Sequence, residues 1–286
     1  MDITTAMIKQ FGGNLELLVQ QKGSVIGDKV RLETGVVGED AYFDQLAPTA
    51  AVRKTVRNSD TPLVKSDHRR RRVSMYDYEW ADLIDKEDKA KTLVNPDNEY
   101  VTNAAFALGR SKDDAIIASA LATAATGKDG STAASFDTTN FQIVHGSVGL
   151  TVAKILSAKK KLDKALNDPS EERFFLCDAA QIADLLAINQ VTSTDYANIK
   201  ALVEGRVDTF SGFKFQMINR LQLSSTTRSC LAYTKSSLLL AIGMDIKTEI
   251  DRIPGKSYST QVYASMGIGS TRMREDGLVE VQCTES

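Results

Sequence analysis

Residues 98–125, NEYVTNAAFALGRSKDDAIIASALATAA, carry the strongest helical pattern in the chain. Apolar side chains recur there at helical spacing, at Val101, Ala105, Leu108, Ile116, Ala120 and Ala124. Asn95-Pro96-Asp97 supplies the proline and the acidic residue that favour a first helical turn. A helix of this length extends about 40 Å, beyond the roughly three or four turns of an average helix. The stretch therefore predicts a spine-like helix with an alanine-rich packing face, ended at Gly127.

The chain after this helix alternates shorter helices and strands. Residues 151–167 predict an amphipathic helix whose inner positions are Val152, Ile155, Leu156, Leu162 and Leu166. Residues 174–177 predict a buried strand, followed by a short helix over 179–188. Alternating β-type segments return at 257–266 and 278–283. This order predicts an α+β fold with a central α/β patch.

The N-terminal part of the chain has few apolar residues from which to form a hydrophobic core of its own. Residues 1–23 place apolar side chains near a helical period, at Ile3, Met7, Phe11, Leu15, Leu18 and Val19. We expect an arm that packs on a partner surface, and the alternative is a helix folded back on the chain's own core. Short β-type runs at 51–57 and 61–64 predict an extended two-stranded excursion. Because an isolated hairpin is marginal in water, a neighbouring subunit would have to support it.

A sharp change of charge follows this excursion. Arg69, Arg70, Arg71 and Arg72 form a basic run, and six acidic residues lie between positions 77 and 88. The two blocks can pair within one chain or between neighbouring chains, or the arginines can form a phosphate-binding patch. The alternation of residues 72–78 is typical of a charged strand with one solvated face, which favours contact with protein over contact with DNA.

Composition and motifs argue against several classes of protein. The 286 residues include 37 acidic and 35 basic side chains, which is unlike a strongly basic nucleic-acid-coating protein. The sequence contains no phosphate-binding glycine loop and no GxSxG motif. Cys177 has only His145 as a distant candidate base, and the odd number of cysteines indicates reduced thiols. We predict no catalytic, cofactor-binding or metal site, no signal peptide and no membrane span.

Three segments resemble the major capsid proteins of tailed bacteriophages, in particular those of podovirus type. They are RRRRVSMYDYEWADLIDKEDK (69–89), NEYVTNAAFALGRSKDDAIIASAL (98–121) and YSTQVYASMGIGSTRMREDGLVEVQC (258–283). The resemblance implies the tailed-phage capsid fold that encapsulin shells share. It also implies four parts, which are an N-terminal arm (1–35), an extended β-hairpin loop (36–75), a peripheral domain with the spine helix (76–150 and 255–286) and an axial α/β domain (151–254).

The same resemblance implies a function. It predicts a non-enzymatic major capsid protein, without cofactors, that self-assembles into an icosahedral head shell enclosing double-stranded DNA. The expected partners are other copies in hexamers and pentamers, a scaffolding protein, a portal, a decoration protein in some systems, and non-specific DNA on the inner face. The expected location is the virion, after assembly in the bacterial cytoplasm and without a membrane. The candidate inter-subunit contacts are Arg69, Arg70, Arg71, Arg72, Asp82, Asp85 and Asp88.

Three other functions remain open from the residues. The first is an encapsulin-like compartment shell, which a cargo-peptide groove on the inner surface would favour. The second is an α/β enzyme, which requires titratable groups converging in a deep pocket. The third is a DNA-binding protein using Arg69–Arg72, whose affinity would depend steeply on salt.

Overall fold

The computed structural model describes residues 20–58, 60–85, 97–165, 167–187 and 209–285. The chain is α+β, as predicted, and divides into two compact units. The first unit draws on residues 1–24, 77–112 and 244–267, and the second on residues 25–76, 113–243 and 268–286. The predicted apolar stripe of the arm, from Ile3 to Val19, lies outside the described residues. The four-part division of the chain stays a prediction.

The long helix predicted from the sequence is confirmed as α2 (Asp97–Leu121). Its buried positions, Ala104, Leu108, Gly109, Asp113, Ile116, Ile117 and Ala120, recur every three or four residues. The helix ends six residues before Gly127, because the chain enters strand β5 (Ala124–Thr126). The predicted end at Gly127 is therefore wrong. Residues 124–126 pair in a sheet although alanine favours a helix.

Gly109 allows residues 23 and 24 to lie directly against α2 within the first unit. A Cβ atom at this position would lie 2.5 Å from the Gly23 Cα atom, so no larger residue fits without a backbone shift. Arg110 reinforces the contact, since its Nη1 donates to Gln20 Oε1 at 2.8 Å and to the Gln21 carbonyl at 3.3 Å. Residues 20–23 are thereby held along the helix.

Asp113 anchors the start of the second unit. Its carboxylate is fully buried and accepts hydrogen bonds from the backbone N–H groups of Val25 and Ile26, at 3.0 to 3.2 Å. The neighbouring Asp114 instead forms a solvent-exposed ion pair with Arg220. Two adjacent aspartates of the same helix thus have very different roles.

Replacing Asp113 should destabilise the fold much more than replacing Asp114. Asp113→Ala leaves two backbone donors without their carboxylate, at about 1–3 kcal/mol for each buried unsatisfied group. Asp114→Ala removes an exposed pair, which contributes about 0–1 kcal/mol. Urea unfolding of unassembled subunits measures both free energies of unfolding, and equal losses would contradict the anchoring role of Asp113.

The first sheet has the strand order β1-β13-β14-β4. Its strands are β1 (Arg31–Thr34), β13 (Leu238–Ile253), β14 (Ser259–Arg272) and β4 (Tyr76–Ile84). In β14 the alternate residues Val262, Ala264 and Met266 are buried. Gly269 lies in the same strand, where a Cβ atom would meet the Ser74 carbonyl oxygen at 2.5 Å. The Gly-Ile-Gly sequence at 267–269 therefore serves close strand packing.

The second sheet forms the α/β patch that the sequence predicts. Its strands in order are β7 (Gln142–Ile143), β15 (Leu278–Thr284), β12 (Thr227–Thr234), β8 (Arg173–Cys177), β10 (Phe213–Met217) and β9 (Thr209–Phe210), with β11 (Leu223–Ser224) beside β12. All five residues of β8 are buried, as expected for a central strand. β8 pairs parallel to β10 and antiparallel to β12.

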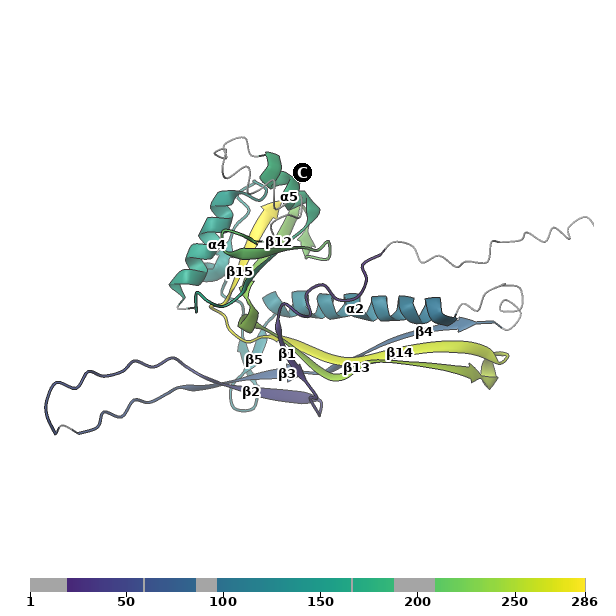
Figure 1. Ribbon diagram of the computed structural model, residues 1–286, viewed down its shortest axis with the longest axis horizontal. Coiled ribbons are helices and arrows are strands. Elements are labelled where there is room, and N and C mark those ends of the chain that lie inside the picture. The colour runs from purple at the N-terminus through teal and green to yellow at the C-terminus, as the bar shows by residue number, and fades with distance from the viewer. Residues whose placement is uncertain (1–19, 59, 86–96, 166, 188–208, 286) are drawn as a thin grey trace, which may run out of the picture. The chain divides into compact units, whose positions relative to one another are not determined.

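Three helices accompany this sheet, and two 3₁₀ turns connect strands. The helices are α3 (Thr138–Phe141), α4 (Val152–Lys164) and α5 (Ala179–Ala187), and the turn η1 (Lys235–Ser237) joins β12 to β13. The other turn, η2 (Pro254–Lys256), joins β13 to β14 and belongs to the first unit. The predicted helices at 151–167 and 179–188 are confirmed as α4 and α5, and Thr151 caps α4 by accepting from the Lys154 N–H. α4 packs on β15 (Figure 1). Leu156, predicted inside, is 52% exposed, while Leu166 lies outside the described residues.

The third sheet carries the extended segment and has the order β2-β3-β5-β6. β2 (Asp40–Leu46) and β3 (His68–Ser74) pair antiparallel, and β6 (Thr132–Ala134) lies beyond β5. Among the described residues from 47 to 67 none lies in a strand, so the runs predicted at 51–57 and 61–64 are wrong. The strands form where β5 and the buried Val73 support them.

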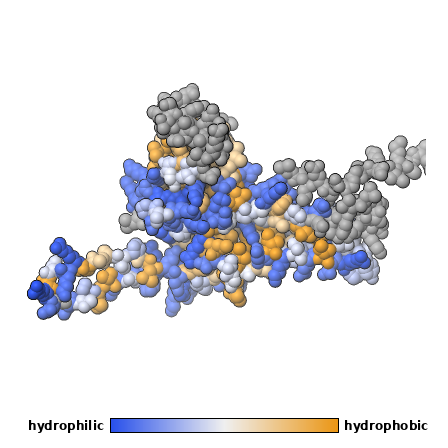
Figure 2. All heavy atoms as spheres, viewed as in Figure 1, coloured by the Kyte–Doolittle hydropathy of each residue, from blue (hydrophilic) through white to orange (hydrophobic). Residues whose placement is uncertain are grey.

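The segment between β2 and β3 exposes apolar side chains. Its ends meet through a hydrogen bond from the Ala47 N–H to the Asp67 carbonyl at 2.9 Å. Leu63 is 94% exposed, and Leu46, Val52 and Val56 are also exposed. Figure 2 shows hydrophobic and hydrophilic residues interspersed along this segment. The described part of the chain therefore leaves these apolar groups uncovered.

Candidate functional site

The basic run forms most of strand β3, and its four arginines have different environments. The strand alternation buries Arg71 and Val73, leaves Arg70 and Arg72 half-buried, and exposes Arg69. β5 pairs with Arg71 and Arg72 on the side of β3 away from β2. Strand β3, which we call the arginine strand, is thus an interior strand of the third sheet and helps to support the extended segment.

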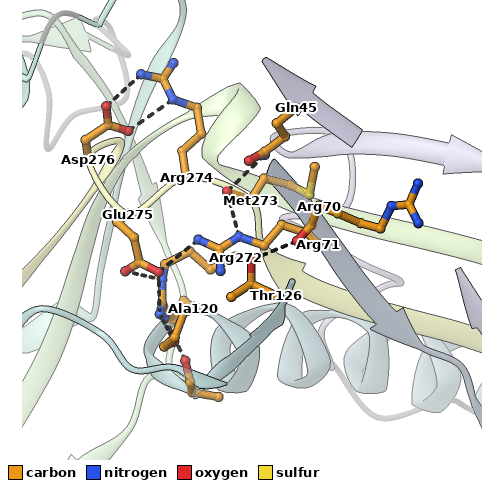
Figure 3. Close-up of polar contacts among 12 residues, drawn as sticks. Gln45, Arg70, Arg71, Ala120, Thr126, Arg272, Met273, Arg274, Glu275 and Asp276 are labelled. Carbon is orange, nitrogen blue, oxygen red and sulfur yellow. Dashed lines mark hydrogen bonds and ion pairs between the residues drawn. The ribbon is translucent and has the colours of Figure 1, made fainter. Parts of the chain in front are cut away.

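Arg272, at the end of β14, is the largest fully buried side chain of the described residues. Its Nη1 donates to the carbonyls of Ala120 and Ala122, at 2.7 and 2.8 Å, at the end of α2. Its Nε and Nη2 donate to the two Glu275 oxygens at 3.0 and 3.2 Å, and Nη2 also donates to the Ala134 carbonyl at 3.1 Å (Figure 3). All five N–H donors of the guanidinium therefore have acceptors.

Arg71 shares the Glu275 carboxylate with Arg272. Its Nη2 lies 3.1 Å from Glu275 Oε1, and its Nε donates to the Met273 carbonyl at 3.2 Å (Figure 3). Burial lowers the pKa of Arg71, the Glu275 carboxylate opposes this decrease, and the charge of Arg272 adds to it. Arg71 Nη1 is buried and has no hydrogen-bond partner among the described residues. One carboxylate therefore serves two buried guanidinium groups.

Arg70 and Arg72 pair with acids of strand β2. Arg70 binds Asp44 with two hydrogen bonds, at 2.6 and 3.2 Å, and the hydrogen bond from Arg70 lowers the pKa of Asp44. Arg72 Nη1 lies 3.7 Å from Asp40 Oδ2. Gly130, at a positive φ of 65°, makes room for Arg72, because a Cβ atom there would lie 2.6 Å from Arg72 Cδ. The turn after β5 is shaped around this side chain.

An open pocket of about 840 Å³ lies beside the arginine strand. Its titratable lining consists of the basic residues His68, Arg69, Arg70, Arg71 and Lys128 and the acidic residues Asp44, Asp137 and Glu275. Its remaining lining consists of the small residues Thr126, Gly127, Thr132, Ala134 and Ser135. Arg69 and Lys128 are exposed, and within the described residues their side chains make no hydrogen bond or ion pair. The pocket thus offers unengaged positive charge at its rim.

The predicted acidic partners of the arginines lie elsewhere. Within this chain Arg70, Arg71 and Arg72 pair with Asp44, Glu275 and Asp40, none of which was among the candidates. Asp82 is exposed and accepts from the Leu83 N–H, while Asp85 accepts from Ser259 Oγ at 2.6 Å. Asp88 lies outside the described residues. Contacts of these residues between subunits stay a prediction.

Some of the acidic partners of the arginines could have been predicted from the sequence, and others could not. Asp40 and Asp44 alternate along β2, and the register places Asp44 directly opposite Arg70. That alternation is a usable signal for cross-strand pairing. The contacts of Arg272 with the end of α2 and of Glu275 with Arg71 carry no such signal, because they join segments far apart along the chain.

The cysteine and histidine considered for catalysis lie in different environments. Cys177 is fully buried, and this burial raises the pKa of its thiol to about 12. His145 Nδ1 accepts from the Ser147 N–H at 3.0 Å and lies 3.2 Å from Thr284 Oγ1. The described residues contain no group of three metal-ligating side chains, and none of their helices is long and apolar enough to cross a membrane.

Removing the shared carboxylate should destabilise the subunit strongly. Glu275→Gln leaves two buried guanidinium groups without a counter-charge, which costs about 3–5 kcal/mol. Asp276→Asn is the matched control, because the ion pair of Asp276 with Arg274 is partly open to solvent and contributes about 0–1 kcal/mol. Denaturant unfolding of the unassembled subunit compares the two. A loss below about 1 kcal/mol for Glu275→Gln would contradict the shared-carboxylate account.

Comparison with known proteins supports the predicted fold. The family model described as phage capsid protein matches residues 3–285. A capsid chain of the cyanophage P-SCSP1u is 18% identical with a TM-score of 0.71, over 98% of this chain and 94% of that chain. A capsid chain of Ralstonia phage GP4 is 10% identical with a TM-score of 0.73, over 99% and 96%. A chain from Mycobacterium phage Che8 is 17% identical with a TM-score of 0.68, over 97% of both.

No curated protein sequence matches the chain. At sequence identities this low, the similarity to solved structures shows the fold alone. They match over nearly the whole length, so the predicted tailed-phage capsid fold is confirmed.

Proposed function

The chain belongs to the phage capsid protein family, and we propose that it self-assembles as the major capsid protein into an icosahedral head shell enclosing double-stranded DNA. The observation that carries the proposal is the family match over residues 3–285, together with capsid folds aligned over nearly the whole chain. A structural role is favoured over the enzyme alternative, because burial raises the pKa of the Cys177 thiol and His145 Nδ1 already accepts from the Ser147 N–H.

The extended segment supports a role in assembly. Residues 47–67 lack a sheet partner within the described chain and expose Val52, Val56 and Leu63. We take these apolar side chains, which the described part of the chain leaves exposed, as a surface that another subunit covers. A closed shell repeats contacts between unlike surfaces of identical subunits, so each copy can offer such a segment to the next. Many individually weak contacts then sum to a stable particle.

We also propose the parts of the chain, its partners and its location. We assign residues 1–35 to an N-terminal arm, 36–75 to the extended loop, 76–150 with 255–286 to a peripheral domain, and 151–254 to an axial domain. The partners would be other copies in hexamers and pentamers, a scaffolding protein, a portal and, in some systems, a decoration protein. The inner face would meet DNA without sequence preference. Assembly would take place in the bacterial cytoplasm, and the product would be the virion.

Assembly of the full-length protein tests the proposal. Size-exclusion chromatography with light scattering should show hexamers, pentamers or larger particles at micromolar concentration, and negative-stain electron microscopy should show capsomers or shells. The driving force is burial of the exposed apolar side chains between copies. A protein that stays monomeric across salt and pH, even when co-expressed with its scaffolding protein, would overturn the proposal.

A further inference from the structure

We propose that the pocket beside strand β3 is a carboxylate-binding site completed by an acidic side chain from a second copy of this chain, with Asp82 on strand β4 as its occupant. The inference rests on the proposed shell function, because it requires two copies to meet. In this arrangement Arg69 of strand β3 and Lys128 would bind the acid of the neighbouring subunit.

The acids that line the pocket are already engaged. Asp44 accepts both hydrogen bonds of Arg70, and Glu275 accepts from Arg71 and Arg272. Asp137 accepts from the backbone and the side-chain amide of Asn140, at 3.1 and 2.6 Å. Each carboxylate of the lining is therefore directed to a partner within the chain.

The cations of the pocket are not all engaged. The side chains of Arg69 and Lys128 are exposed and make no hydrogen bond or ion pair with the described residues. Arg71, which also lines the pocket, is 8% exposed and has an Nη1 with no partner among the described residues. Because a buried donor without an acceptor is costly, an acceptor from outside this chain would stabilise the site. The surplus of positive charge requires that acceptor to be anionic.

The chemistry of the lining favours a single carboxylate over a nucleic acid. Double-stranded DNA carries one phosphate charge about every 1.7 Å, so a bound duplex would bring several charges near Asp44, Asp137 and Glu275. One carboxylate can approach Arg69 and Lys128 without this repulsion. The planar arginine fork also matches a carboxylate with two parallel hydrogen bonds.

Strand β4 supplies the acid best suited to the pocket. β4 is the last strand in the order β1-β13-β14-β4, and it is largely exposed. Glu79 accepts from Tyr263 Oη at 3.0 Å, and Asp85 accepts from Ser259 Oγ. Asp77 lies against the Gly267 backbone, where a Cβ atom would meet its Oδ1 at 3.1 Å. Asp82 is exposed, and its carboxylate accepts only the N–H of the next residue, Leu83, among the described residues. Asp82 is therefore an exposed acid on this strand that can bind another subunit.

Charge reversal at the pocket tests the inference. Arg69→Glu with Lys128→Glu reverses the unengaged rim without touching the pairs of Arg70, Arg71 or Arg272. The control is Lys247→Glu with Arg252→Glu, which reverses two exposed cations of strand β13 outside the pocket. Light scattering should show that the concentration needed for assembly rises about tenfold or more for the pocket variant and about twofold or less for the control. The urea midpoints of both variants should match that of the unaltered protein.

Adding Asp82→Lys to the pocket variant identifies the occupant. Every copy carries both a pocket and an Asp82, so the triple variant restores opposite charges across the contact and should recover most of the lost assembly. Failure to recover would overturn Asp82 as the occupant. Pocket-variant assembly equal to the control, in a protein that assembles normally, would overturn the pocket inference and leave the shell function intact. Normal assembly with loss of packaged DNA would overturn it in favour of a phosphate site, whereas no assembly of the unaltered protein would overturn the shell function itself.

Discussion

Arg272 holds together parts of the second unit that lie far apart in the sequence. Its five donors reach the end of α2, strand β6 and Glu275, which follows β14. The last carbonyls of a helix lack partners within the helix and favour a positive charge nearby. A fully buried guanidinium is tolerated only when its charge and its donors are all satisfied. Arg272 therefore fixes the position of β14 relative to the end of α2, together with the hydrogen bond between the Ser119 and Ser270 hydroxyls at 2.7 Å.

The base of the extended segment depends on the same cluster. Glu275 joins Arg272 to Arg71 on β3, while Gln45 on β2 donates to the Met273 carbonyl at 3.0 Å. Both strands of the segment are thus fixed at their base, and residues 47–67 extend beyond it without a sheet partner in the described chain. The fixed base keeps the pocket lining in place, and in the proposed shell the exposed part would gain its contacts from other copies. This division suits a subunit that folds alone and completes its contacts on assembly.

Local patterns predicted a large share of the fold. Helical spacing predicted α2, α4 and α5, and an unbroken apolar run predicted β8. The runs at 51–57 and 61–64 misled because β propensity in a strand depends on its neighbours, and those residues have none within the described chain. The basic run was recognised as a candidate contact region. Its partners were not, because the contact of Arg71 with Glu275 spans 204 positions and leaves no local trace.

Native-state hydrogen exchange of an Arg272→Lys variant tests the central dependence most directly. Lysine keeps the positive charge but loses the planar fork, so it cannot reach all the acceptors of Arg272. The account predicts that amide protection in β3, in β5 and in the last turn of α2 falls together in the unassembled subunit. A loss of protection confined to residues 271–276, with β3, β5 and α2 as protected as in the unaltered protein, would contradict it.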